Sequence, residues 1–79
     1  MTETELTKLH TTPMGEERIR RNLRLATGIN PLEFCRTIIT DPAAIIVPEG
    51  KNLYVTLQNY RITIHRTSCS IITAHILKQ

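Results

Sequence analysis

The spacing of hydrophobic residues changes character once along this chain, near Pro42. Before that point apolar residues recur every three to four positions, as on one face of a helix, and after it they alternate with polar residues, as in half-buried strands. We therefore expect a helical half over residues 1–41 and a sheet half over residues 42–79, together making one small domain. The fold class predicted is α+β, with two to three N-terminal helices packed on one face of a three- to four-stranded antiparallel meander sheet.

Capping residues and prolines mark the helix boundaries. Thr12 before Pro13 is typical of a helix start, because the hydroxyl can accept a backbone N–H and proline is tolerated in the first turn. Asn30, with Glu33 three residues on, indicates a second start. These signals predict a short helix or frayed arm over residues 2–9, a helix from Pro13 to about Leu25, and a helix from Asn30 to about Asp41.

The alternating half predicts strands joined by short turns, which makes consecutive strands antiparallel neighbours. The expected strands span residues 43–47, 53–58, 60–66 and 69–77. The expected core unites one sheet face with the helices and comprises Ile19, Leu23, Phe34, Ile38, Leu53, Val55, Ile62, Ile64 and Ile72. The opposite sheet face would then carry Tyr54, Thr56, Arg61, Thr63, His65, Thr73 and His75.

Composition narrows the protein class. The 79 residues are 41% hydrophobic but only 4% aromatic, which indicates a globular domain with an aliphatic core. No apolar run approaches the roughly 18 residues of a membrane span. The first nine residues are polar and acidic, unlike a signal peptide, and two cysteines are too few for a disulfide framework. A cytoplasmic protein without a membrane partner is expected.

Charge is uneven along the chain. Residues 1–41 balance six basic against six acidic side chains, whereas residues 42–79 carry four basic residues and a single acid, Glu49. The sheet half is therefore the positive half of a chain with net charge +3. This balance permits a phosphate-bearing partner without requiring one.

Two polar residues fall within the apolar arc of the first long helix, which extends from Met14 and Leu25 to Ile19 and Leu23. Arg18 and Asn22 lie one turn apart on that arc. A buried or half-buried arginine needs a partner, because desolvating an unpaired charge is costly. Either the two side chains bond to backbone carbonyls or to Asp41 at a seam between helix and sheet, or they border a polar cleft that binds an anion.

The polar sheet face combines histidines, an arginine, a tyrosine and hydroxyls without an acid. It is either a plain solvated face or part of a site that cleaves phosphodiesters without metal, which needs a base, an acid and a cation. In the second interpretation His10 and His75 are the catalytic pair. The substrate-binding residues are then Arg18, Asn22, Lys51, Tyr54, Arg61 and Thr73. The histidine and cysteine spacings match no metal site, so no metal or cofactor is expected.

Several short stretches resemble a small bacterial domain family of unknown function. They are Leu9-His10-Thr11-Thr12, Gly15, Arg18-Ile19, Asn22-Leu23, Gly50-Lys51-Asn52, Tyr54-Val55 and Ile71 to His75. The resemblance spans nearly the whole chain and implies no established activity, but it draws attention to His10, Arg18, Asn22, Lys51 and His75. The layout, helices followed by a meander sheet, is loosely similar to the barnase/RelE/colicin-type small RNases, a similarity that implies a toxin paired with an antitoxin or immunity protein.

Three functional hypotheses follow. The first is a small RNA-binding protein that acts as a metal-independent endoribonuclease of toxin type. The second is a non-enzymatic module that binds a protein or a small anionic ligand, such as a phage-defence or anti-defence factor. The third is a structural homodimer or larger homo-oligomer that hides the polar sheet face. Convergence of His10, Arg18 and His75 in the fold would favour the first.

Overall fold

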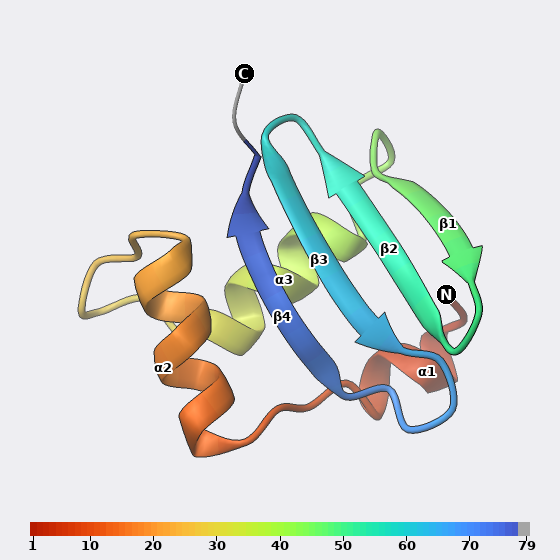
Figure 1. The fold of residues 1–79 in the computed structure, drawn as a ribbon, viewed down its shortest axis with the longest axis horizontal. Helices are drawn as coiled ribbons and strands as arrows, with labels where there is room; N and C mark the ends of the chain where they lie inside the picture. Colours follow the sequence, from red (N-terminus) through yellow and green to blue (C-terminus); the bar gives the residue numbers. More distant parts are fainter. Residues whose placement is uncertain (78–79) are drawn as a thin grey trace.

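The computed structural model describes residues 1–77 and shows, within them, three helices followed by four strands (Figure 1). The elements are α1 (Glu3–Thr7), α2 (Pro13–Asn22), α3 (Pro31–Ile39), β1 (Ile45–Glu49), β2 (Asn52–Leu57), β3 (Tyr60–His65) and β4 (Ile71–Ile76). The strands form one antiparallel sheet in the order β1-β2-β3-β4. The predicted α+β class is confirmed, with the sheet at the upper limit of the predicted strand number.

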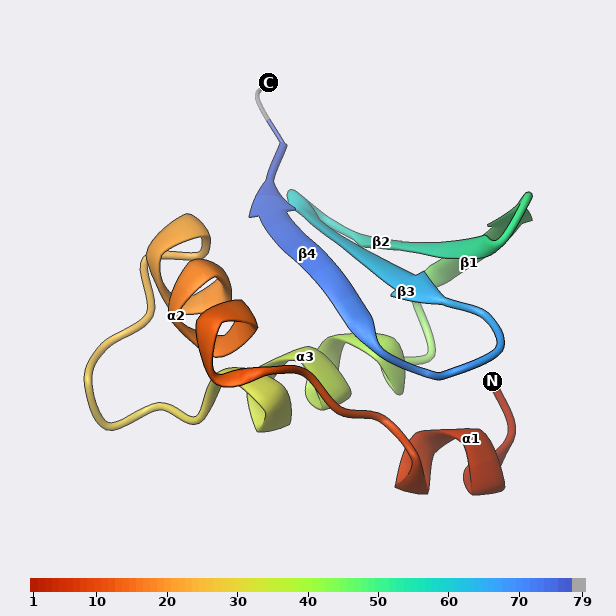
Figure 2. The same ribbon diagram turned by 60° about the horizontal axis from the view of Figure 1, so that its bottom comes forward.

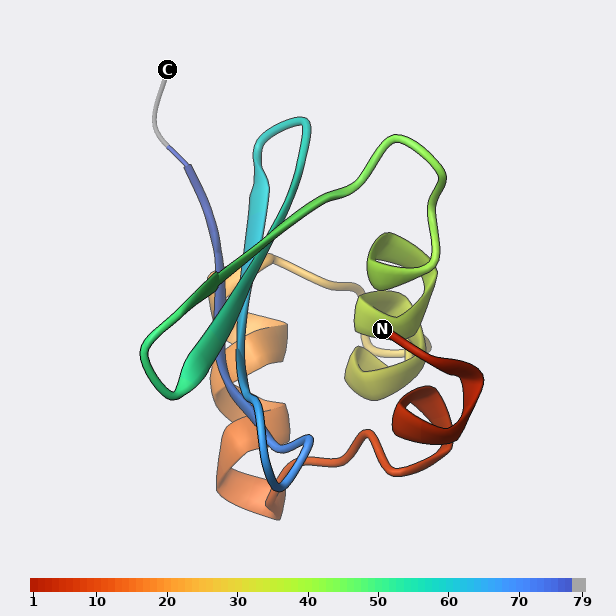
Figure 3. The ribbon, with the colours of Figure 1, turned by 90° about the vertical axis from the view of Figure 1, so that its right-hand side faces the viewer.

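The helices are distributed unequally around the sheet. Helices α1 and α3 lie on one side of it (Figure 3), and α2 lies beside β4, running in the same direction (Figures 1 and 2). We call the sheet face toward α1 and α3, which carries Val55, Ile62 and Ala74, the inner face. The opposite face, which carries Tyr54, Arg61 and His75, is the outer face, and no described helix covers it.

The core lies between the inner face and the helices. Its buried members are Leu9, Ile19, Leu23, Cys35, Ile38, Ile39, Val55, Ile62, Ile64, Ile71 and Ala74. Most of the predicted core residues are confirmed, although Phe34 and Leu53 are only partly buried and pack against its edge. Phe34 makes an edge-to-face contact with Tyr60, with ring centroids 5.5 Å apart.

Side-chain caps explain where the helices begin. Thr2, Thr12 and Asn30 each accept a hydrogen bond from the backbone N–H three residues on, at distances of 3.2, 3.0 and 3.0 Å. The predicted end of α2 at Leu25 is wrong, because the helix ends at Asn22 and Arg24 takes a left-handed backbone conformation (φ 55°). Arg20 fixes the chain after this turn by donating from Nη1 to the carbonyls of Ala26 and Ile29, both at 2.9 Å.

The first strand starts later than predicted. Ala43 belongs to a turn, because its amide donates to the Asp41 carboxylate at 2.8 Å, and β1 instead begins at Ile45 and extends through Pro48 to Glu49. Proline has no amide to donate, so its presence is compatible with an edge strand. Strand β1 is one edge of the sheet.

A bulge in β4 overturns the predicted inner position of Ile72. The register pairs Ile64 with Ile71 and Thr63 with Thr73, so Ile72 is an extra residue in β4. Consequently Ile71 is buried at 3% exposure while Ile72 is 43% exposed, and Ala74 returns to the inner face. A single unpaired residue thus reverses the alternation expected before it.

The free side of β4 is covered by the segment that leads into α2 and by α2 itself. His10 forms a parallel bridge with Ser70, and its carbonyl accepts the amide of Ile71 at 2.8 Å. The Thr11 hydroxyl donates to the Ile71 carbonyl at 3.2 Å. Further along, Asn22 Nδ2 donates to the Ala74 carbonyl at 3.1 Å. These contacts satisfy backbone groups that an edge strand would otherwise expose.

Candidate functional site on the outer face of the sheet

The outer face is organised in cross-strand rows, because residues opposite each other in register share a face. One row contains Tyr54, Thr63 and Thr73, and the next contains Thr56, Arg61 and His75. The structure therefore brings four of the predicted site residues onto one surface: Tyr54, Arg61, Thr73 and His75. Thr63 is the middle residue of the first row and is 7% exposed, and the four site residues around it are half-buried.

Arg61 and Tyr54 are in direct contact. The guanidinium carbon of Arg61 lies 4.6 Å from the centroid of the Tyr54 ring. Such a cation–π contact holds the guanidinium close to the surface of the sheet instead of letting it extend into solvent. Within residues 1–77 Arg61 forms no ion pair, so its positive charge is not neutralised by a carboxylate.

Strand β1 adds a different character to this face. Ile45 and Val47 are opposite Thr56 and Tyr54, and they are 63% and 49% exposed. Glu49 is opposite Asn52 at the end of the hairpin, so the described part of the outer face has one acid, located at its corner. The face is therefore apolar at β1, whereas β2 to β4 add hydroxyl groups, the Arg61 guanidinium and the His75 ring.

His10 is not part of this surface. It pairs with Ser70 at the start of β4, five positions before His75, which corresponds to about 16 Å along a strand. Its ring Nδ1 lies 2.8 Å from the carbonyl oxygen of Lys8, and its side chain is exposed. The structure thus does not bring the predicted catalytic pair together, and the roles of His10 and His75 in catalysis stay a prediction without geometric support.

Arg18 and Asn22 have separate environments despite their helical spacing. Asn22 is half-buried and lies at the seam between α2 and β4, where its amide bonds to the Ala74 carbonyl. For Asn22 the structure therefore shows the first of the two alternatives given above, a hydrogen bond to a backbone carbonyl at a seam between helix and sheet. Arg18, in contrast, is exposed, so the expectation that it is buried or half-buried is wrong. The reason is that Met14, which widens the apolar arc of the sequence, is itself 77% exposed in the fold.

Lys51 lies outside the centre of the outer face. It is exposed at the turn between β1 and β2, and its backbone carbonyl accepts the amide of Arg66 at 2.8 Å. Arg66 Nη1 also donates to the Gly50 carbonyl at 3.2 Å. The structure therefore places Lys51 with the hairpin turns at one end of the sheet, apart from Arg61 and His75.

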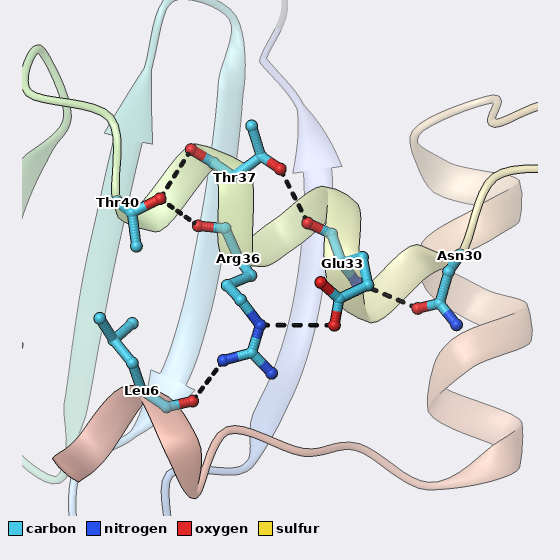
Figure 4. A network of polar contacts seen from close by, with 6 residues as sticks. All are labelled: Leu6, Asn30, Glu33, Arg36, Thr37 and Thr40. Carbon is cyan, nitrogen blue, oxygen red and sulfur yellow. Dashed lines mark hydrogen bonds and ion pairs between the residues drawn. The ribbon is translucent and has the colours of Figure 1, made fainter. Parts of the chain in front are cut away.

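Sequence reasoning missed a polar network between α1 and α3, on the inner side of the sheet. Arg36 on α3 pairs with Glu33 at 3.4 Å, and its Nη1 donates to the carbonyl of Leu6 in α1, as Figure 4 shows. The Thr37 hydroxyl donates to the Glu33 carbonyl, and the Thr40 hydroxyl donates to the Arg36 carbonyl. This network joins α1 to α3 and is structural, because its groups bond to backbone carbonyls or to each other.

A serine–histidine contact at the β3–β4 turn was also missed. Ser68 Oγ lies 3.2 Å from His65 Nδ1, and the Ser68 amide donates to the same nitrogen at 3.3 Å. Ser68 Oγ in turn accepts the Ser70 amide at 3.3 Å. The hydroxyl is therefore committed to the turn that precedes β4, and a nucleophilic role does not follow from the contact.

Other chemistry is limited in the described chain. Across residues 1–77 no three histidine, cysteine or acidic side chains are grouped as they would be around a metal ion. Both cysteines are buried, including Cys69, and burial raises the pKa of the Cys35 thiol to about 12. None of the helices described is of a length and hydrophobicity that would let it cross a membrane.

Comparison with known proteins identifies a family without assigning an activity. No curated protein matches the chain significantly, and neither does any solved structure. The barnase-like similarity of layout therefore receives no support. Residues 3–75 match one family, which includes all of α1 to β3 and most of β4. The chain belongs to the family described as "Protein of unknown function (DUF3781)".

Proposed function

We propose that the protein binds single-stranded RNA on the outer face of its sheet. The observation that carries the proposal is the Arg61–Tyr54 contact at 4.6 Å, on an open sheet face whose one acid among residues 1–77, Glu49, lies at its corner. Proteins that bind single strands combine stacking surfaces for the bases with cations for the backbone, and both aromatic rings and guanidinium groups serve as stacking surfaces. The hydroxyls of Thr56 and Thr73 add hydrogen-bonding groups on either side.

Single-stranded RNA fits this surface better than a duplex. The bases of an RNA duplex are stacked within the helix and are not available to an aromatic side chain, whereas unpaired bases can be spread on a sheet. The proposal is for binding alone. A toxin-type cleavage step would require an acid and a base near one phosphate, and His10 is about 16 Å along β4 from His75. An RNA-binding role is consistent with the expected cytoplasmic location.

One observation favours the alternative of a protein partner. Ile45 and Val47 are exposed apolar residues on the outer face of β1, and apolar patches often mark protein interfaces. The two partners differ in their response to salt. Contacts to phosphates release counterions, so RNA affinity falls steeply as salt increases, whereas an interface built on Ile45 and Val47 would be largely insensitive.

The test is a fluorescence-anisotropy titration of a labelled ten-nucleotide oligouridylate at several salt concentrations. The Tyr54→Leu variant should lose about 1–3 kcal/mol of binding free energy if a base stacks at this position, and Tyr54→Phe, which keeps the ring, should retain most of it. Arg61→Gln should reduce the slope of log K against log salt by about 0.7, the value expected for one phosphate contact of a single strand.

Lys8→Gln provides the control for lost positive charge. Lys8 is exposed just after α1, on the helix side of the molecule, so its removal should leave the affinity nearly unchanged. Absence of binding by the wild-type protein at low salt, or equal losses in Lys8→Gln and Arg61→Gln, would contradict the proposal. Binding of a protein partner that is lost in Ile45→Ser and unaffected by salt would support the alternative.

A further inference from the structure

The seam between α2 and β4 divides the surface of α2 into two sides. Asn22 faces the edge of β4, because its amide bonds to the Ala74 carbonyl. Counted at about 100° per helical residue, the buried Ile19 and Leu23 lie roughly 60° and 100° to one side of Asn22. That side faces the core beneath the inner face of the sheet.

Two arginines lie on the other side of Asn22. By the same count Arg18 is about 40° and Arg21 about 100° from Asn22, in the direction opposite to Ile19. Because the Ile19 side continues into the inner face, the Arg18 side continues past the edge of β4 toward the outer face. Both arginine side chains are exposed.

The two arginines are also level with the outer-face residues of β4. Helix α2 and β4 run side by side in the same direction (Figure 1). Arg18 precedes Asn22 by about 6 Å of helix rise, and Ile72 precedes Ala74 by about 7 Å of strand rise. Measured along the common direction of α2 and β4, Arg18 therefore lies beside the bulge at Ile72, and Arg21 lies beside Ala74 and His75.

Among residues 1–77, Arg18 and Arg21 differ from Arg20 and Arg36 in having no bonding partner. Arg20 and Arg36 donate to backbone carbonyls, and Arg36 also pairs with Glu33. For Arg18 and Arg21, in contrast, no hydrogen bond or ion pair is found in the described part of the chain. Their spacing of three residues makes them like-charged neighbours on one helix, which is an unfavourable arrangement in the absence of an anion.

An open hollow accompanies the two side chains. Its volume is about 370 Å³, and it is lined by Pro13, Met14, Glu17, Arg18 and Arg21. Glu17 is the acid of this set, and it lies about 40° beyond Arg21, further from the β4 seam. The cations are thus nearer to the outer face than the carboxylate is.

We infer that Arg18 and Arg21 bind phosphate groups of the RNA strand where it leaves the outer face across β4. The inference rests on the proposed function and extends it by giving the strand a direction, from Arg61 and His75 over the bulge to α2. Ile72, which the bulge leaves 43% exposed, offers an apolar contact at the crossing. The surface formed by Arg18, Arg21 and Ile72 then continues the part of the outer face that carries Arg61. The apolar β1 end lies outside the proposed course of the RNA strand.

The experiment compares the Arg18→Gln/Arg21→Gln double variant with the wild-type chain, using the ten-nucleotide oligouridylate across a series of salt concentrations. Loss of two phosphate contacts should lower the slope of log K against log salt by about 1.4. If both proteins extrapolate to the same affinity at 1 M salt, the double variant should bind roughly 25-fold more weakly at 0.1 M. Lys8→Glu is the matched control, because it changes the net charge by the same two units on the helix side.

The outcomes separate this inference from the function on which it rests. A reduced slope in the double variant, with the slope of Lys8→Glu close to wild type, supports the phosphate contacts. If wild type binds, Arg61→Gln weakens binding, and the double variant matches Lys8→Glu, the path over α2 is overturned while the outer-face site stands. If wild type fails to bind, both proposals fall. Because neither arginine has a partner in the described chain, the double variant should show the circular dichroism spectrum of wild type.

Discussion

The two faces of the sheet are made from the same strands but differ in burial and polarity. On the inner face Val55, Ile62 and Ala74 are fully buried, and their side chains belong to the apolar core. On the outer face, directly adjacent in sequence, Tyr54, Arg61 and His75 are half-buried and carry hydrogen-bonding or charged groups. The difference shows that alternation assigns one face to stability and leaves the other available for binding.

The arginines show the same division. Arg20 and Arg36 face protein carbonyls and hold loops and helices in place, whereas Arg18 and Arg21 have no protein partner in the described structure. A count of basic residues therefore overstates the charge available to a ligand. The side chains whose charge the protein itself leaves uncompensated are the ones open to an anionic ligand.

The largest expected effect tests the inner face against the outer face. Ile64 is completely buried, so Ile64→Ala should cost roughly 2–5 kcal/mol in the free energy of unfolding, through lost burial and the cavity left behind. Thr56→Ala on the outer face is the matched truncation and should change it by well under about 1 kcal/mol. Urea denaturation followed by circular dichroism measures both. Similar losses in the two variants would mean that the outer face is also part of the stabilising core.

A smaller effect should separate the two kinds of arginine within α2. Arg20→Gln removes a guanidinium that bonds to the carbonyls of Ala26, Thr27 and Ile29, so about 1 kcal/mol of stability should be lost. Arg18→Gln should leave the stability unchanged or raise it by a few tenths of a kcal/mol, because a like-charge pair is relieved. The same urea titrations decide the matter, and a destabilised Arg18→Gln would reveal a structural contact for that side chain.

The smallest expected effect is the loss of α1 at low pH. Hydrogen bonds from the backbone and the hydroxyl of Thr2 lower the pKa of Glu5 below its ordinary value of 4.5. A lowered pKa in the folded state means that the contribution of Glu5 is complete above pH 4.5 and is lost as the pH falls through the lower folded value. We expect α1 to fray in acid while the outer-face strands persist. Amide NMR signals of residues 2–7 against pH would show this, and Glu5→Gln should remove the dependence whereas Glu3→Gln should keep it.

The sequence predicted most where local chemistry decides the structure. The caps at Thr12 and Asn30 and the alternation through β2 and β3 depend on neighbouring residues alone, and they appear as expected. The bulge at Ile72 could not be predicted in this way, because Ile71 and Ile72 are chemically equivalent and only pairing with β3 decides which one is buried.

The candidate site was harder to predict because it depends on topology. The outer-face group of Tyr54, Arg61, Thr73 and His75 followed from alternation and is present. The prediction that His10 and His75 form a catalytic pair did not follow from any local rule. The bridge between His10 and Ser70 keeps the two histidines apart. The prediction for Arg18 is wrong because it counts Met14 and Leu25 as part of the apolar arc, whereas Met14 is exposed and Leu25 lies beyond the helix.

The edge strand β1 has a consequence for how copies of this protein behave when concentrated. At the other edge, α2 and the segment before it already bond to backbone carbonyls of β4. Within residues 1–77, β1 is therefore the more accessible edge for a foreign strand, and its exposed Ile45 and Val47 favour such pairing. Pro48 interrupts the same edge with a position that has no amide to donate. Replacement of this proline by a β-branched residue would lengthen a continuous adhesive edge, and self-association into fibrous aggregates should increase first in that variant.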